Sequence, residues 1–131
     1  MERAPRVDHV TLTIGDLKTS SAWYRALFGA AETFTLTGPG WQRQVLYWPG
    51  GLAVGLTEYA ATTAGDAFDH TRVGLDHLGL ACRSSDEVRA WAARMDELGV
   101  VHGPVEEVPY GWAVTARDPD GIAVEFFCLR S

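Results

Sequence analysis

The sequence predicts an α+β fold in which one structural unit occurs twice. The hexapeptide VDHVTL at residues 7–12 recurs as LDHLGL at 75–80, so that His9 and His77 are 68 residues apart. The same offset relates Trp23 to Trp91, and an offset of 70 aligns WPGGLAVG at 48–55 with DPDGIAVE at 118–125. Self-similarity over half a chain is typical of a repeated supersecondary unit. We therefore expect the chemistry to lie where the two copies face each other.

The composition indicates an ordinary globular protein. A chain of 131 residues has the length of one domain, and 47% hydrophobic residues against 21% charged residues suffice for a packed core. The net charge is -6 and the eleven Lys and Arg residues form no run, which argues against nucleic acid or an anionic membrane as a partner. No apolar run has the length of a membrane span and the first residues do not read as a signal peptide, so a cytoplasmic location is expected. Cys82 and Cys128 are predicted to be reduced core thiols.

The first copy reads as a strand, a helix and three further strands. Residues 7–14 alternate between apolar and polar, which predicts a half-buried strand with His9 on its more polar face. The side chains of Asp16 and of residues 19–21 are expected to cap a short helix that carries Trp23 and Leu27 inward and ends at a left-handed Gly29. Three strands with two turns between them follow, the strands at 31–36, 41–48 and 52–58 and the turns at 37–40 and 49–51.

The second copy repeats this order after a segment of different composition. Residues 59–73 are rich in Ala, Thr, Gly and Asp and are predicted to be the linker and a candidate flap. A strand ending at Cys82 precedes a helix with a capping box formed by Ser84 and Glu87. Strands are then expected within 100–108, at 112–117 and at 122–129. The predicted modules are therefore 7–58 and 74–129.

His9, His77 and Glu125 form a candidate metal site. Alternation along the last strand places Glu125 on one face with Phe127, among aliphatic and aromatic neighbours where an unpaired carboxylate is costly. A divalent cation would remove that cost. Two imidazoles and one carboxylate suit iron(II), manganese or zinc and leave coordination positions open. A single strand histidine more often has only a packing role, but its repetition at equivalent positions favours the metal.

The position equivalent to Glu125 in the first copy is Gly55, which has no side chain to offer as a ligand. Glu58 lies three residues further along the strand, so its side chain is predicted to point to the opposite face. By the same rule, Asp8 and Asp76 are predicted to point away from the histidines that follow them and not to support these imidazoles.

The paired units, the V-D-H-V start, the D-P-D-G-I-A-V-E-F-F ending and the Trp-Tyr helix resemble the vicinal oxygen chelate superfamily. This superfamily includes glyoxalase I, extradiol dioxygenases, fosfomycin-resistance thiol transferases, methylmalonyl-CoA epimerase and bleomycin-resistance proteins. The resemblance covers essentially the whole chain. It implies two tandem βαβββ modules whose curved mixed sheets surround a central cleft, and it implies a homodimer.

The resemblance also implies that His9, His77 and Glu125 are the metal ligands. Fe²⁺ or Mn²⁺ is favoured as the cofactor, with Zn²⁺ or Ni²⁺ as alternatives. Glyoxalase I and the epimerase use a Glu or Gln where this chain has Gly55, so proton-shuttling glyoxalase chemistry is disfavoured. The remaining triad is more similar to that of extradiol dioxygenases and fosfomycin transferases.

The predicted function is that of a metal-dependent enzyme acting on a small substrate with vicinal oxygens, by dioxygenase-like or lyase/transferase-like chemistry. The alternative is a drug-sequestering binder of the bleomycin-resistance type, for which five Trp residues and an acidic surface would be suited. Metal content separates the two. A metal-structured protein without turnover is a third possibility. Fosfomycin transfer is less favoured because its phosphonate requires clustered cations, whereas Arg43, Arg72 and Arg117 are isolated in sequence.

Further candidates concern the substrate. Tyr47 and Tyr110 are catalytic candidates near the expected mouth of the site, although strand-end tyrosines more often have packing roles. Tyr59 and His70 are similar candidates, and His102 is expected at the surface. The candidate substrate-binding residues are strand residues near the ligands and aromatic residues of the hairpins, namely Thr11, Trp41, Trp48, Gly55, Trp112 and Phe127. The alternative for the three tryptophans, equally favoured, is that they only cover the sheet.

Overall fold

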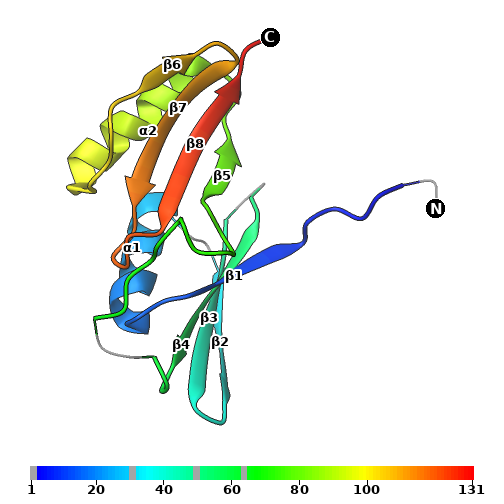
Figure 1. Ribbon diagram of the computed structural model, residues 1–131, viewed down its shortest axis with the longest axis vertical. Coiled ribbons are helices and arrows are strands. Elements are labelled where there is room, and N and C mark those ends of the chain that lie inside the picture. Colours follow the sequence, from blue (N-terminus) through cyan, green and yellow to red (C-terminus); the bar gives the residue numbers. More distant parts are fainter. Residues whose placement is uncertain (1–2, 30–31, 49–50, 63–64) are drawn as a thin grey trace. The chain divides into compact units, whose positions relative to one another are not determined.

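The computed structural model describes residues 3–29, 32–48, 51–62 and 65–131, which form two compact units, Met1–Asp66 and Ala67–Ser131. Each unit has the order strand, helix, strand, strand, strand (Figure 1). The predicted α+β class and the two βαβββ modules are therefore confirmed.

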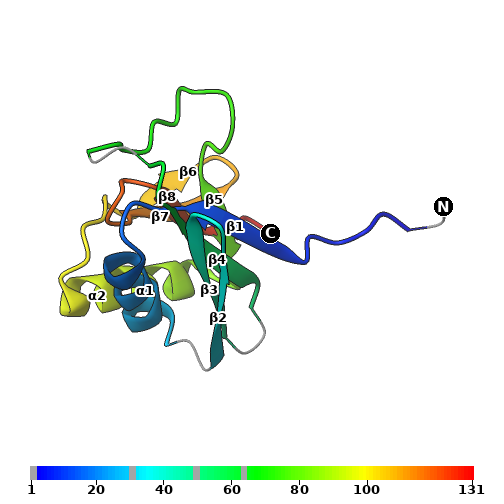
Figure 2. The same cartoon turned by 90° about the horizontal axis from the view of Figure 1, so that it is seen from below.

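The first unit is a four-stranded mixed sheet with one helix. Its strand order is β1-β4-β3-β2, with β1 parallel to β4 and the other pairs antiparallel. The helix packs against β3 and β4 (Figure 2). Its elements are β1 (His9–Thr13), α1 (Leu17–Phe28), β2 (Glu32–Gly38), β3 (Trp41–Tyr47) and β4 (Ala53–Tyr59).

The second unit repeats this arrangement. Its strand order is β5-β8-β7-β6, again with one parallel pair, β5 with β8. The helix α2 lies along β7 and β8 (Figure 1). The elements are β5 (Leu78–Ala81), α2 (Ser85–Leu98), β6 (Glu106–Val108), β7 (Gly111–Arg117) and β8 (Ala123–Leu129).

The strand registers confirm the duplication residue by residue. Gly55 pairs with Thr11 on one side and Val45 on the other. Glu125, at the predicted equivalent position, pairs with Gly79 on one side and Thr115 on the other in the second sheet. The sequence offsets therefore correspond to the same places in two like sheets.

Each sheet buries one face against its helix and leaves the other without a helix. In the first unit, Leu12, Leu46 and Val54 are buried on the helix side, where Tyr24 and Leu27 of α1 are also fully buried. Trp23, which was predicted to point inward, is only half-buried, and its ring lies edge-on to Tyr24. The helix therefore turns Tyr24 toward the sheet.

The core of the second unit lies between β8 and α2. Val124 and Phe126 of β8 and Val88 and Met95 of α2 are at most 1% exposed. The ring of Phe126 stacks on Trp91 with centroids 4.6 Å apart. Burial of such side chains contributes about 1.5–3 kcal/mol each, which fixes the helix to one side of the sheet.

The predicted helix ends are confirmed. The carboxylate of Asp16 accepts hydrogen bonds at the start of α1, and Gly29 follows the helix with φ 62°. Ser84 accepts from the Glu87 N–H at the start of α2. The Glu87 carboxylate accepts from the N–H of Arg83 and not from that of Ser84.

Some element boundaries differ from the prediction. The strand expected to end at Leu36 continues to Gly38 because its pairing with β3 extends to Trp41. In the second unit, β5 begins only at Leu78, and β6 is confined to three residues. The predicted strand residue Ala31 and the predicted turn residues Pro49 and Gly50 lie outside the described residues.

Candidate metal and substrate site

His77 and Glu125 come together in the second unit. Glu125 lies in the middle of β8, on the face opposite α2, whereas His77 directly precedes β5, the strand that pairs with β8. Their side chains approach with His77 Nε2 and Glu125 Oε1 3.7 Å apart. This separation is longer than a hydrogen bond.

An aspartate supports each of the two repeated histidines. Asp76 Oδ1 lies 2.6 Å from His77 Nδ1, and Asp8 Oδ2 lies 2.7 Å from His9 Nδ1. The hydrogen bond to His77 also holds the pKa of Asp76 below its usual value. With Nδ1–H donating to a carboxylate, Nε2 is the nitrogen with a lone pair for a ligand.

The prediction that both aspartates point away from the imidazoles was therefore wrong. The strand rule assumes extended backbone on both sides of the residue, but His9 is the first residue of β1 and His77 lies before β5. Outside the ladder, consecutive side chains are free to turn toward each other. The repeated Asp-His dipeptide was the signal available in the sequence.

His9 is presented by the first unit in the manner of His77. It shares the helix-free face of the first sheet with Thr11, and the sheet places Gly55 directly beside Thr11. A Cβ atom at Gly55 would lie 2.9 Å from Thr11 Oγ1, so the threonine occupies the space that a side chain would enter. The first unit thus offers the His9 imidazole, and Gly55, the position equivalent to Glu125, supplies no carboxylate opposite it.

Within the described part of the chain, no three His, Cys, Asp or Glu side chains gather closely enough to hold a metal ion. The structure brings together His77 and Glu125, and His9 belongs to the other unit. The complete triad stays a prediction.

The substrate candidates of the second unit divide between the two faces of its sheet. Phe127 shares the face of Glu125, and its ring centroid lies 5.9 Å from that of Tyr110. Trp112 pairs with Cys128 on the opposite face, where Arg130 covers its ring at 4.3 Å. Phe127 and Tyr110 are thus grouped on the side of Glu125, whereas Trp112 is not.

The first unit shows the same division. Trp41 and Tyr47 lie in β3 on the face that includes Thr11 and Gly55. Trp48 follows the strand and stacks on Phe28 of α1, with ring centroids 4.6 Å apart. Trp48 therefore lies on the helix side of the first sheet.

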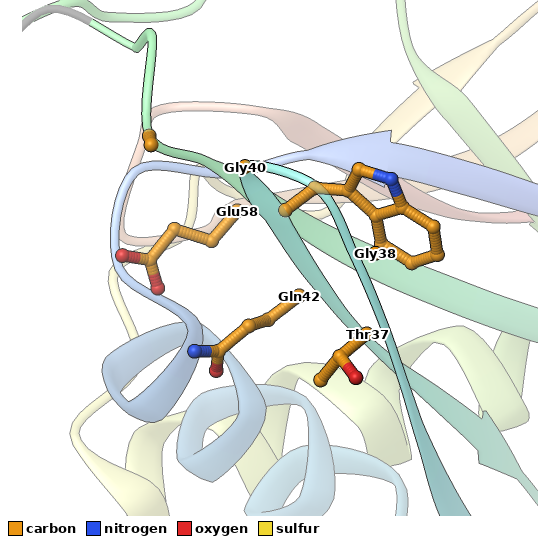
Figure 3. A pocket seen from close by; sticks show the side chains of 7 residues that line it. Thr37, Gly38, Gly40, Gln42 and Glu58 are labelled. Atoms are coloured by element: carbon orange, nitrogen blue, oxygen red, sulfur yellow. The ribbon is translucent and has the colours of Figure 1, made fainter.

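A shallow pocket of about 300 Å³ opens at the end of the first sheet where β2 connects to β3 (Figure 3). Thr37, Gln42 and Glu58 are among its lining residues. The carboxylate of Glu58 accepts a hydrogen bond of 2.9 Å from the N–H of Leu17, the first residue of α1. Glu58 therefore stabilises the helix start, as expected for a side chain on the face opposite Gly55.

Two other titratable groups, Cys82 and His102, have contacts that lie outside the candidate site. Burial raises the pKa of the Cys82 thiol to about 11, so it is protonated at neutral pH and a poor nucleophile. Cys82 and Cys128 are both free, and Cys128 is buried as predicted, whereas Cys82 is only half-buried. His102 contacts Asp96 and the carbonyl of Gly103 at 2.6 Å each, and the aspartate contact raises its pKa. It links the end of α2 to β7 and has no place in the candidate site.

Residues 6–126 match the family model of the Glyoxalase/Bleomycin resistance protein/Dioxygenase superfamily. The chain belongs to this superfamily. A glyoxylase/bleomycin resistance protein/dioxygenase domain from Frankia sp. EAN1pec is 33% identical, with a TM-score of 0.89 over 98% of this chain and 95% of that one. The relationship thus extends over both modules.

Two further superfamily structures are similar at greater distance. Lactoylglutathione lyase from Agrobacterium tumefaciens is 26% identical, with a TM-score of 0.71 and 96% of each chain covered. The fosfomycin resistance protein FosX from Listeria monocytogenes is 19% identical, with a TM-score of 0.73 over 98% and 96% of the two chains, a likeness of fold. No curated protein matches this chain in sequence. Among the described residues, no helix is both long and apolar enough to cross a membrane.

Proposed function

We propose that this superfamily member is a divalent-metal-dependent enzyme acting on a small substrate with two neighbouring oxygen atoms. The observation that supports this most directly is the approach of His77 Nε2 to Glu125 Oε1 at 3.7 Å, with the other imidazole nitrogen occupied by Asp76. Imidazole and carboxylate suit Fe²⁺ or Mn²⁺, and also Zn²⁺ or Ni²⁺. His9, whose Nδ1 is occupied by Asp8 in the same way, completes the proposed ligand set.

The proposed reaction uses the open coordination positions of a three-ligand site. A bound divalent cation would supply Lewis acidity toward the two oxygens of the substrate. The protein contributes fixed imidazoles and Phe127, an apolar side chain on the face of Glu125. A FosX variant of 21% identity has been crystallised with Mn(II) and 1S,2S-dihydroxypropylphosphonic acid, a ligand with vicinal oxygens.

Gly55 restricts the reaction class. A mechanism that shuttles a proton between two opposed carboxylates needs a second acid at this place, which the chain does not provide. Dioxygenase-like chemistry, or a lyase or transferase reaction without that second carboxylate, is therefore favoured. Tyr110 is the hydroxyl donor that the second unit offers beside Phe127.

Metal content tests the proposal. Protein purified anaerobically is expected to contain about one equivalent of Fe²⁺ or Mn²⁺ per chain by elemental analysis. The loaded protein is then assayed with catechols for oxygen uptake and with other vicinal diols for turnover. Absence of metal even after reconstitution would contradict the proposal and favour the sequestering binder.

Replacement of Asp76 by asparagine is expected to weaken binding of Mn²⁺ about tenfold, because outer-shell carboxylates orient the imidazole and make it more basic. Calorimetric titration with Mn²⁺ measures the change. Two-bond ¹H–¹⁵N spectra of the metal-free protein report the tautomer directly: His77 is expected to carry its proton on Nδ1 in the parent and to become a mixture in the variant. Asp86→Asn, at an exposed site on α2, removes the same charge and serves as the control. Parental affinity and tautomer in Asp76→Asn would show that the aspartate has no such role.

A further inference from the structure

Arg43 lies in the interior of the first sheet, on the face without a helix. Its strand, β3, is flanked by β2 and β4, and Arg43 pairs with Leu36 on one side and Thr57 on the other. His9 and Gly55 belong to the same face by the register of β1 with β4 and of β3 with β4. A guanidinium group is thus placed in the middle of the surface on which the first unit presents its imidazole.

Two contacts hold the guanidinium in place. Arg43 Nε donates a hydrogen bond of 2.7 Å to Thr57 Oγ1, and Thr57 is only 1% exposed. The guanidinium carbon lies 4.9 Å from the ring centroid of Trp41. Much of the rotamer entropy of this long side chain is therefore lost before any ligand binds.

The rest of the guanidinium remains available. Among the residues that the structure describes, Arg43 forms no salt bridge, and Thr57 is its hydrogen-bond partner through Nε. The two terminal nitrogens carry four further N–H donors in a planar fork. Such a fork matches two oxygens of a carboxylate, phosphonate or phosphate.

Arg43 shares this face with exposed apolar side chains. Leu36 is 43% exposed, Phe34 45% and Tyr47 40%, and the rings of Phe34 and Tyr47 lie 5.8 Å apart. Exposed apolar side chains grouped beside a fixed charge are typical of a ligand surface. A ligand suited to this surface has an anionic group and an apolar body.

The second unit shows that the fold does not require this arginine. By the offset of 70, the equivalents of Arg43 and Thr57 are Ala113 and Phe127, which pair with each other in the second sheet. The same architecture therefore forms without the cation and its hydroxyl support. The pair of Arg43 and Thr57 is an addition to the first copy.

We propose that Arg43 is an oxyanion-binding residue that recognises a carboxylate or phosphonate group on a ligand whose apolar body contacts Phe34 and Leu36. That the ligand is the enzyme's substrate rests on the proposed function. The binding step itself needs only residues of the first unit. The substrate class inferred is an acid with an apolar portion and vicinal oxygens.

The test is a titration of the metal-free full-length protein with phenylphosphonate, followed through the Nε–Hε resonance of Arg43 in ¹H–¹⁵N spectra. The hydrogen bond to Thr57 slows exchange of the Nε proton with water, so this resonance is observable. It is expected to shift saturably as the anion binds to the charged guanidinium. Arg43→Gln and Arg43→Lys are expected to bind about tenfold more weakly or worse, since a charged hydrogen-bonded fork is lost. Arg89→Gln, which removes an exposed charge on α2, is expected to bind as the parent does.

Two further measurements separate the possible failures. Benzyl alcohol, a neutral aromatic probe, is expected to bind parent and Arg43→Gln equally, and inorganic phosphate is expected to bind the parent more weakly than phenylphosphonate. His77→Ala is expected to keep phenylphosphonate binding, so a failure of the metal proposal leaves this result intact. Equal affinity of parent and both Arg43 variants for phenylphosphonate, or an unmoved Arg43 resonance, would overturn the assignment.

Discussion

Glu125→Ala is expected to lower the affinity of the protein for Mn²⁺ by more than about a hundredfold, beyond the effect of losing an outer-shell partner. The carboxylate is the anionic donor that the second unit places 3.7 Å from His77 Nε2. Without it, a neutral imidazole remains there, and the attraction of a divalent cation to a negative ligand is lost. Calorimetric titration with Mn²⁺, supported by elemental analysis of purified protein, measures the loss.

The fold is expected to survive this substitution. The side chain of Glu125 is 26% exposed and lies on the helix-free face, whereas Val124 and Phe126 form the packed side of β8. Far-ultraviolet circular dichroism and the thermal midpoint are therefore expected to change little. Glu97→Ala on the exposed face of α2 is the matched control, because it removes the same charge at a distance from the site. If Glu125→Ala bound Mn²⁺ as tightly as Glu97→Ala, the ligand assignment would be refuted.

The duplication allowed the fold to be predicted because two kinds of periodicity agreed. Alternation marked the strands, and the repeated segments fixed which strands are equivalent, so that Gly55 and Glu125 could be matched before their registers were known. Helix ends were predictable for a local reason: Asp16, Gly29 and Ser84 act on backbone groups within a few residues of themselves.

The predictions that failed concern the direction in which individual side chains point. Asp8 and Asp76 precede the ladder, where alternation no longer decides the direction of a side chain. In α1, adjacent Trp23 and Tyr24 compete for the core, and composition alone does not show which of two aromatic residues the helix rotates inward.

Part of the candidate site was identifiable from the sequence. His77 was indicated by its repetition as His9, and Glu125 was indicated as a carboxylate among apolar neighbours; the structure places these two side chains 3.7 Å apart. Arg43 was recognised only as an isolated cation, because its support comes from Thr57, fourteen residues away in the chain and adjacent only after β3 and β4 pair. Contacts of this kind depend on the register of two strands, which a single sequence does not specify.

Phe126→Ala is expected to reduce the free energy of unfolding by about 3–5 kcal/mol, the usual cost of truncating a buried aromatic side chain. Phe126 is 1% exposed and stacks on Trp91, so its removal leaves a cavity between β8 and α2 that neither element fills without moving. Urea unfolding followed by circular dichroism and by Trp fluorescence measures the change.

The next residue provides the matched control. Phe127 has the same side chain in the same strand, but it lies on the face of Glu125, is half-buried and contacts Tyr110. Phe127→Ala is therefore expected to cost less than about half as much as Phe126→Ala, because less apolar surface returns to water. Phe127→Ala is also expected to weaken the binding of an aromatic ligand, because Phe127 is a candidate substrate-binding residue. If the two variants lost equal stability, Phe126 and Phe127 would not lie on a buried and a more exposed face of β8. The placement of Glu125 on the face opposite α2 would then be contradicted as well.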